Sequence, residues 1–184
     1  MPGATKLLKQ EHRSIRVALD FAERMTSWIE RGEDVSSEAL ARLMEFIHLF
    51  VEQCHHAKKE KIFFPALESK GVSTEGGPIG VMLADHERAR ALIQEMKGAV
   101  EKYKHGLPKS GERWARAAWD YSGLMQEHFG KEEEILFRMA DSVLTPEVQG
   151  VIVADFQRLE EESCGPGKHE ELRAWMRELA SRQT

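Results

Sequence analysis

The amino-acid sequence predicts an all-α protein, an antiparallel up-down four-helix bundle with additional C-terminal helices. Three observations support this prediction. Apolar residues recur at spacings of three and four along four long segments, which is the period of an amphipathic helix. Glycine and proline cluster between these segments, where they end one helix before the next begins. No segment alternates between apolar and polar residues over a useful length, so we predict no strands.

The first two segments each carry histidine on the apolar stripe. The first stripe runs through Leu8, His12, Ile15, Leu19 and Ala22. Residues 31–34 break this pattern, and Ser36 or Ser37 can cap the next helix by accepting a bond from a free backbone N–H. On the second stripe we expect His56 and Glu60 to face the core, while His55 sits about 100° away around the helix.

The third and fourth segments repeat this arrangement. The glycine-rich stretch 71–80 is turn chemistry, and the helix that follows has His86 embedded among apolar residues. The stretch 106–111 makes the next break. The fourth helix then carries His128 and Glu132 on its stripe, followed by Ile135 and Leu136. In a bundle of four such helices these side chains converge on one region of the core.

Two further helices are predicted at the C-terminus. Thr145 can cap a fifth helix, and Pro146 is tolerated at its first position. Gly165 and Gly167 flank Pro166 and end that helix, and a last one follows over about residues 168–180. We expect both to pack outside the bundle. The organisation is therefore a single domain over residues 1–184, with the bundle at about 5–140 and the helical extension at about 145–182.

Composition narrows the functional classes. A chain of 184 residues with 41% hydrophobic content suits one domain with a sizeable core. The net charge of −5, with charges interleaved, argues against nucleic-acid binding. No apolar run of about 18 residues suggests a membrane span, and the N-terminus lacks a signal-peptide layout, so a cytoplasmic location is expected. Cys54 and Cys164 are most simply free thiols. The sequence leaves the oligomeric state open.

The pattern His-x-x-x-Glu occurs twice, at His56–Glu60 and His128–Glu132. A spacing of four residues places both side chains on one face of an α-helix, so each pair can grip one cation together. Imidazole nitrogen and carboxylate oxygen suit iron, manganese or zinc, whereas a calcium or magnesium site would be built almost wholly from oxygen. The pattern therefore predicts a transition-metal site.

The full set favours a metal over a purely structural role. One histidine on an apolar stripe is usually a core residue bonded to a carbonyl. Burying four imidazoles and two carboxylates without a cation, however, would cost several kcal/mol for each uncompensated group. The set also exceeds the ligands of a single zinc. We therefore predict a di-iron centre with bridging carboxylates.

Other polar residues are expected outside the site. His48, His105 and His169 lie off the inward stripes or near loops, and we expect them at the surface. Glu133 and Glu134 are expected to be solvated. His55 stays open, because a small rotation of its helix would bring it into the site or beside a ligand.

The sequence resembles hemerythrin-like (HHE cation-binding) proteins over about residues 5–140. The resemblance rests on Glu11-His12 and on the segments 54–65, 77–87 and 127–137, which follow the order H, HxxxE, H, HxxxE. It implies a four-helix bundle with a non-haem di-iron centre, oxo- or hydroxo-bridged, that binds O2, NO or a related small ligand. The implied metal ligands, with His55 as an alternative to His56, are His12, His55, His56, Glu60, His86, His128 and Glu132.

Two positions depart from the resemblance. Arg90 stands where oxygen-carrying hemerythrins have a further histidine, and Lys59 stands where related proteins often show a glutamate. An additional open coordination position would favour peroxide or other redox chemistry over oxygen storage. The alternatives are therefore a di-iron enzyme that consumes peroxide or oxidises iron, and a protein of iron-sulfur cluster repair or iron donation. A ferritin-like oxidase would need two Glu-x-x-His motifs, and Glu52-x-x-His55 has no counterpart near His128.

Overall fold

Helices make up all the regular structure in residues 3–181, the part of the chain that the computed structural model describes. The all-α prediction is confirmed, while the up-down order of the helices stays a prediction. Two of the long helical segments contain wider π-helical turns, named η1 to η3. The elements are α1 (Ala4–Glu30), α2 (Ser37–Phe46), η1 (Ile47–His56), η2 (Lys59–Phe63), α3 (Phe64–Glu68), α4 (Pro78–Lys104), α5 (Ser110–Lys131), η3 (Glu132–Leu136), α6 (Phe137–Val143), α7 (Pro146–Cys164) and α8 (Lys168–Ser181).

The ends of several helices follow the predicted signals. The Ser36 hydroxyl accepts a hydrogen bond from the backbone N–H of Ala39, and the Thr145 hydroxyl accepts one from Val148, each at 3.4 Å. Pro146 stands at the start of α7, where its missing N–H costs no helical hydrogen bond. Local sequence therefore sets where α2 and α7 begin.

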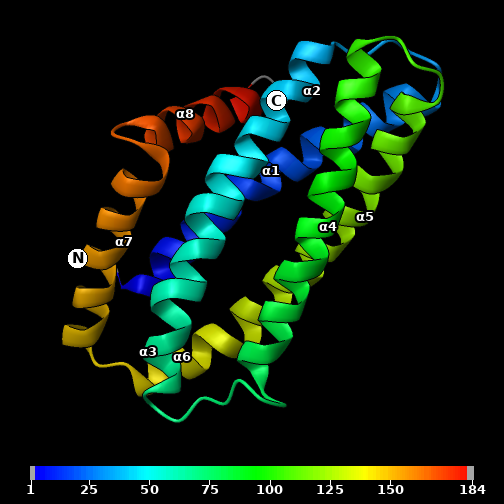
Figure 1. Cartoon of the computed structure of the whole chain (residues 1–184). Helices are drawn as coiled ribbons and strands as arrows, with labels where there is room; N and C mark the ends of the chain where they lie inside the picture. The colour runs from blue at the N-terminus through cyan, green and yellow to red at the C-terminus, as the bar shows by residue number, and fades with distance from the viewer. Residues whose placement is uncertain (1–2, 182–184) are drawn as a thin grey trace.

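The bundle packs around two apolar clusters (Figure 1). Helices α4 and α5 run side by side, and α1 packs against α5. The larger cluster contains Phe46, Phe50 and Trp114, and the smaller one contains Phe63 and Phe137. Each of the four segments that form the bundle passes from one cluster to the other close to its histidines. A buried polar layer consequently separates the two halves of the core.

The C-terminal helices cover one side of this bundle, as predicted. In Figure 1, α7 and α8 lie on the side of α1 and of the segment that contains α2 and η1, away from α4 and α5. Helix α7 packs against η1 and η2, and α8 packs against α1 and η1. The extension therefore contacts the part of the chain that carries His55 and His56. Its last predicted position, residue 182, lies outside the described residues.

The π-helical turns change which side chains face inward. A π-helical turn closes its hydrogen bonds between residues five apart, so it is wider than an α-helical turn and shifts the register of the residues that follow. The predicted inward position of Ile135, in η3, is wrong, because its side chain is 53% exposed. Its neighbour Leu136 is buried. The same effect acts on η1 and η2 around the predicted ligands.

Two other expectations bear on the molecule as a whole. The prediction of a free thiol is wrong for Cys54, which is buried and disulfide-bonded. The side chain of Cys164 lies outside the described part of the structure. Among the described helices, none combines the length and the apolar character needed to cross a membrane.

Candidate metal centre

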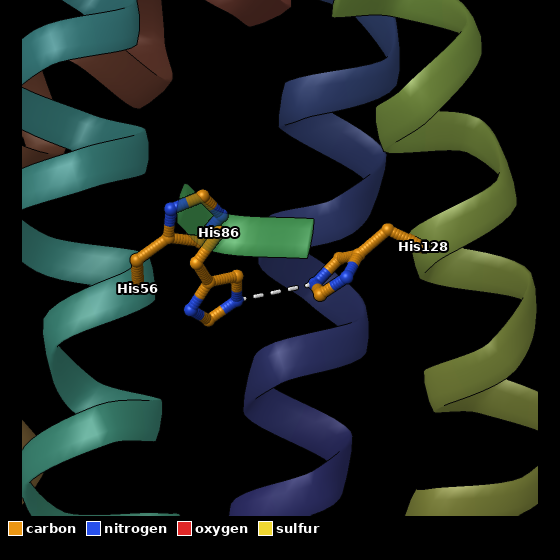
Figure 2. A group of neighbouring side chains, drawn as sticks. All are labelled: His56, His86 and His128. Carbon is orange, nitrogen blue, oxygen red and sulfur yellow. Dashed lines mark hydrogen bonds between the residues drawn. The ribbon is translucent and has the colours of Figure 1, made fainter. Parts of the chain in front are cut away.

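Two groups of buried side chains form the polar layer. The first group, named here the upper site, consists of His56, His86 and His128 (Figure 2). The second, named the lower site, consists of His12, His55 and Glu132. Within each group the potential ligand atoms lie within 4.8 Å of one another. All six side chains are 0% exposed, so both groups are shielded from bulk water.

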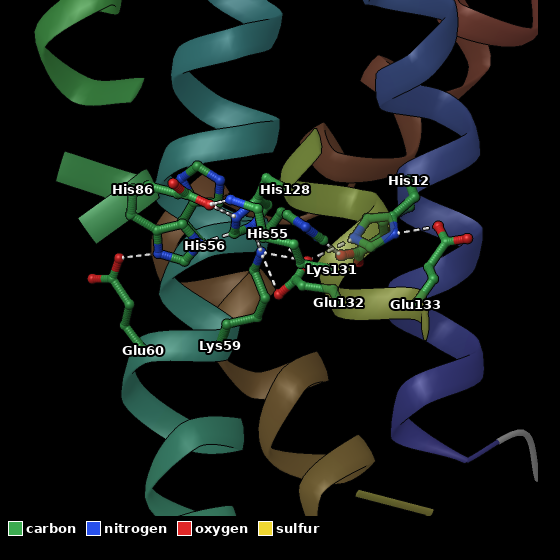
Figure 3. A network of polar contacts seen from close by, with 12 residues as sticks. His12, His55, His56, Lys59, Glu60, His86, His128, Lys131, Glu132 and Glu133 are labelled. Atoms are coloured by element: carbon green, nitrogen blue, oxygen red, sulfur yellow. Dashed lines mark hydrogen bonds and ion pairs between the residues drawn. The ribbon is translucent and has the colours of Figure 1, made fainter. Parts of the chain in front are cut away.

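Four parts of the bundle bring these residues together (Figure 3). They are α1, the second helical segment (α2 to α3), α4, and α5 with η3. The rings of His56 and His86 stack with their centroids 3.9 Å apart, and the ring of His12 stacks on Phe129 at 4.1 Å. Packing therefore fixes these rings by their faces, so their orientation does not depend on a bound group.

Each of the five imidazoles has a carboxylate at its outer nitrogen, Nδ1. The pairs are His12–Glu133 at 2.7 Å, His55–Glu11 at 2.8 Å, His56–Glu52 at 3.0 Å, His86–Glu60 at 2.6 Å and His128–Asp85 at 3.4 Å. An ionised carboxylate only accepts hydrogen bonds, so Nδ1 carries the proton in each pair. The other nitrogen, Nε2, then has its lone pair available as a ligand. Metal-bound histidines are oriented by outer hydrogen bonds of this kind.

Burial keeps three of these rings neutral. It lowers the pKa of His56 to about 4 although the Glu52 carboxylate opposes the change, and the Lys59 ammonium contributes to the lowering. Burial likewise holds the pKa of His55 and of His86 well below its ordinary value. Near neutral pH these three imidazoles are therefore uncharged, which is the form that binds a metal ion.

Several inner nitrogens lack a hydrogen-bond donor from the described protein groups. His55 Nε2 and His56 Nε2 are buried and have no hydrogen-bond partner among the described residues. His86 Nε2 and His128 Nε2 face each other at 3.3 Å. With both outer nitrogens protonated, His128 Nε2 accepts a hydrogen bond from Lys59, while the lone pair of His86 Nε2 faces another acceptor. Buried polar atoms are normally paired, so these atoms fit a metal ion.

Lys59 lies between the two sites. Its ammonium donates to His128 Nε2 at 2.9 Å and to Glu132 Oε2 at 3.0 Å, and the side chain is 0% exposed. Glu132 Oε2 also lies 3.2 Å from His12 Nε2 and 3.3 Å from His128 Nε2. Burial lowers the pKa of Lys59, although Glu132 opposes the change. Burial alone would raise the pKa of Glu132, but Lys59 and the histidines hold it well below its ordinary value.

A third buried cluster adjoins the lower site. Glu11, Glu160 and His169 lie together, with the Lys58 ammonium hydrogen-bonded to both carboxylates. Lys58 is 1% exposed. Although burial opposes it, the two carboxylates raise the pKa of Lys58, and Lys58 with His169 and His55 holds the pKa of Glu11 well below its ordinary value. Here a protein ammonium already supplies the positive charge.

The two sites bring together five of the predicted ligands, whose role as ligands stays a prediction: His12, His56, His86, His128 and Glu132. His55, which the sequence left open, lies in the lower site beside His12. Glu60 lies in neither site. Its carboxylate bonds His86 Nδ1 and the guanidinium of Arg90, and its side chain is 24% exposed.

Three of the residues that we expected at the surface, His48, His169 and Glu133, are partly or largely buried. His105 is exposed as predicted, and His48 is half-buried. The surface prediction for His169 is wrong, because it is 8% exposed and its ring stacks on Phe50 at 4.4 Å. Glu133 is half-buried rather than solvated, because it holds His12 and also pairs with Arg16 at 2.9 Å. His169 belongs to α8 and is buried where this helix packs against η1, a contact that periodicity within one helix could not reveal.

Sequence reasoning also missed the carboxylates behind the rings. Glu11 and Asp85 precede His12 and His86 by one residue, and each binds a histidine of another helix instead. The signal was present in Glu52, which stands four residues before His56 and bonds it along the same helical segment. Acidic residues next to inward histidines were thus a usable indication of outer hydrogen bonds.

Comparison with known families agrees with this geometry. The model of the family described as "Hemerythrin HHE cation binding domain" matches residues 3–140, which is about three quarters of the chain and contains both sites. Neither a search of curated proteins nor a search of solved structures finds a match. Helices α7 and α8 lie beyond the matched region. On the strength of the family match, this chain belongs to the hemerythrin HHE cation-binding family.

Proposed function

We propose that the chain binds two iron ions, one in each site, and that this di-iron centre binds O2, NO or a related small ligand. The observation that carries the proposal is the common orientation of five buried imidazoles. Each has its outer nitrogen on a carboxylate and its inner nitrogen directed at the space between the helices. A structural role for these rings would leave several buried lone pairs without a partner.

The donor set suits iron. The upper site offers three imidazole nitrogens, and the lower site offers two imidazole nitrogens and a carboxylate. Mixed nitrogen and oxygen donors of this kind are typical of non-haem iron. Glu132 contacts histidines of both sites, so its carboxylate is the one that would bridge two ions. Glu60 acts on this proposal as the carboxylate that orients His86.

Three protein ligands at each site would leave coordination positions for a small molecule. Bound iron would supply electrons and a Lewis-acidic position for that molecule. The protein side chains do the rest. Phe129 and Phe64 pack against the rings of His12 and His86 and keep bulk water out. The Lys59 ammonium holds protons at Nζ beside both sites, where it can donate a hydrogen bond to an anionic ligand.

A surface cleft gives small molecules an approach to the upper site. It has a volume of about 390 Å³, and its lining includes Glu52, Glu60 and Arg90. The two carboxylates hold His56 and His86 from behind, and Arg90 pairs with both of them. Movement of the Arg90 side chain would therefore open a route beside these two histidines.

Metal content and absorption spectra test the proposal. Iron-loaded protein should hold two ions per chain and show an absorption band of an oxo-bridged ferric pair that azide shifts. The variant His86→Ala should lose at least one ion, while His105→Ala, which alters an exposed histidine, should keep both. A wild-type protein that retains one ion or none after loading would contradict the di-iron proposal.

Lys59 favours one enzymatic alternative. A hydrogen-bond donor beside both sites could assist the conversion of two peroxide molecules to two waters and one O2. In that case diferric protein should evolve oxygen repeatedly when peroxide is added, and Lys59→Met should slow the turnover at unchanged iron content. A single stoichiometric reaction followed by loss of the absorption band would exclude repeated turnover.

A further inference from the structure

The C-terminal extension contacts the lower site through a buried chain of charged groups. Glu160 of α7 bonds the Lys58 ammonium, and the same ammonium bonds Glu11 Oε1. The other oxygen of this carboxylate, Glu11 Oε2, accepts the Nδ1 proton of His55 at 2.8 Å. Two intervening side chains therefore connect helix α7 to a proposed metal ligand.

His169 of α8 closes the same cluster. Its Nε2 lies 3.6 Å from Glu11 Oε1, and its Nδ1 lies 3.6 Å from Glu160 Oε2. Stacking on Phe50 holds the ring in place. Glu11, Lys58 and His169 are each at most 8% exposed, so solvent screens their interactions only weakly. Both C-terminal helices thus contribute a group that faces Glu11.

The geometry points to a positioning role for the extension: Glu160, acting through Lys58 and Glu11, keeps His55 oriented with its Nε2 directed into the lower site. Lys58 is shared between two carboxylates, so Glu11 keeps one oxygen free for His55. Without the Glu160 charge, the Lys58 ammonium would interact with Glu11 alone. It would then draw the electron density of the Glu11 carboxylate away from His55. The hydrogen bond that selects the Nδ1–H form of His55 would weaken.

Among the residues that the structure describes, the upper site has no such connection. Its outer carboxylates are Glu52, Glu60 and Asp85, and the basic residues that pair with them are Arg90, Arg88 and Lys131. These residues belong to α4, α5 and the second helical segment. The extension should therefore affect the lower site and leave the upper site unchanged. This selectivity distinguishes a positioning role from a general effect on the fold.

The cluster around Lys58 is not itself a metal site on this view. Its ammonium hydrogen-bonds both carboxylates, so a metal ion would have to displace a buried lysine from two partners. Its place beside the lower site instead gives it an influence on His55.

Nuclear magnetic resonance of the metal-free protein tests the positioning directly. Long-range ¹H–¹⁵N spectra distinguish an imidazole protonated at Nδ1 from one protonated at Nε2. We expect His55 in the Nδ1–H form in the wild type and a mixture of the two forms in Glu160→Gln. Glu160→Asp, which keeps the charge, should restore the wild-type form. Glu162→Gln, at an exposed position of the same helix, should change nothing.

The signals of His56 and His86 serve as internal controls, because their outer nitrogens bond Glu52 and Glu60, which lie outside the cluster around Lys58. They should stay unchanged in Glu160→Gln. If His55 keeps the Nδ1–H form and its wild-type chemical shifts in Glu160→Gln, the positioning role is wrong. Equal changes at all three histidines would also overturn it, since they would indicate a general loosening of the bundle.

A metal titration measures the consequence, and this part rests on the proposed function. We expect two Co²⁺ binding events in the wild type, and in Glu160→Gln an affinity about tenfold weaker for one of them, as for other outer partners of metal ligands. Equal weakening of both events, or of neither, would contradict the selective role. Fewer than two events in the wild type would contradict the proposed two-ion centre, and the His55 tautomer would still decide the positioning.

Discussion

Lys58 and Lys59 are neighbours in the sequence and are both buried, yet their surroundings are opposite. Burial opposes the charged form of each side chain. At Lys58 two carboxylates, Glu11 and Glu160, outweigh this effect and raise the pKa. At Lys59 burial dominates and lowers the pKa, because among the described residues its ammonium bonds one carboxylate, that of Glu132, and its other partner is the ring nitrogen His128 Nε2.

The difference separates a structural cation from one placed at a reactive site. Lys58 completes a charge cluster in which every strong acceptor is engaged. Lys59 is held by fewer carboxylates, and it lies among nitrogen atoms that would bind a metal ion. A lysine of the first kind stabilises the fold, whereas one of the second kind competes with the metal. Three measurements test this contrast.

The largest effect is expected for Lys58→Met in the metal-free protein. The substitution leaves Glu11 and Glu160 buried without their shared partner, and removing one member of such an ion pair costs about 3 to 5 kcal/mol of unfolding free energy. Urea denaturation followed by circular dichroism measures the change. Lys61→Met, at an exposed position on the same segment, should change stability by no more than about 0.5 kcal/mol. A loss for Lys58→Met as small as that of the control would mean that the cluster contributes little.

The metal-free protein should also lose stability as the pH falls below 6.5. His56 has a pKa of about 4 in the fold and an ordinary value of 6.5, so between these values the unfolded chain binds a proton that the folded chain does not. Its contribution is therefore complete above pH 6.5 and declines at about 1.4 kcal/mol per pH unit on acidification. His55 and His86 act in the same direction.

Urea midpoints at pH 7, 6 and 5 measure this slope above the range where carboxylates titrate. The slope should be shallower in Lys59→Met, because the Lys59 charge is one cause of the lowered histidine pKa values. Burial, the larger cause, would remain. A stability that stays constant from pH 7 to pH 5 would show that the buried histidines take up protons without unfolding.

The smallest effect is expected for metal affinity in Lys59→Met. Removing a positive charge that lies 2.9 Å from His128 Nε2 should strengthen Co²⁺ binding by about tenfold, or 1.4 kcal/mol. Competition with a chelator followed by absorption measures the affinity. Lys61→Met is again the matched control. A weaker affinity in Lys59→Met would mean that the lysine supports the site, for example by keeping Glu132 in place.

Much of the fold could be predicted because local signals determine it. The caps at Ser36 and Thr145 follow from single residues, and the inward positions of His12, His86 and His128 follow from helical periodicity. The convergence of these histidines needed only the assumption that four amphipathic helices pack their apolar faces together. The same pattern of inward histidines also predicts the metal-binding character of the family.

The remaining features depend on effects that one helix does not encode. Wider turns at η1 and η2 bring both His55 and His56 inward and leave Glu60 to bond His86 from the partly exposed side. His169 and Lys58 are buried by contact between the C-terminal helices and the bundle. Residues this far apart in the sequence meet through tertiary packing, for which spacing alone gives no signal.

The π-helical turn at η1 makes the composition of the site depend on chain length as well as on residue identity. Each added or removed residue rotates the rest of an α-helix by about 100°. Deleting one residue within η1 would relax the wide turn and turn one of the two adjacent histidines away from the core, with the helix otherwise intact. An evolutionary gain or loss of one codon in this segment could thus convert a site that uses both histidines into a site that uses one.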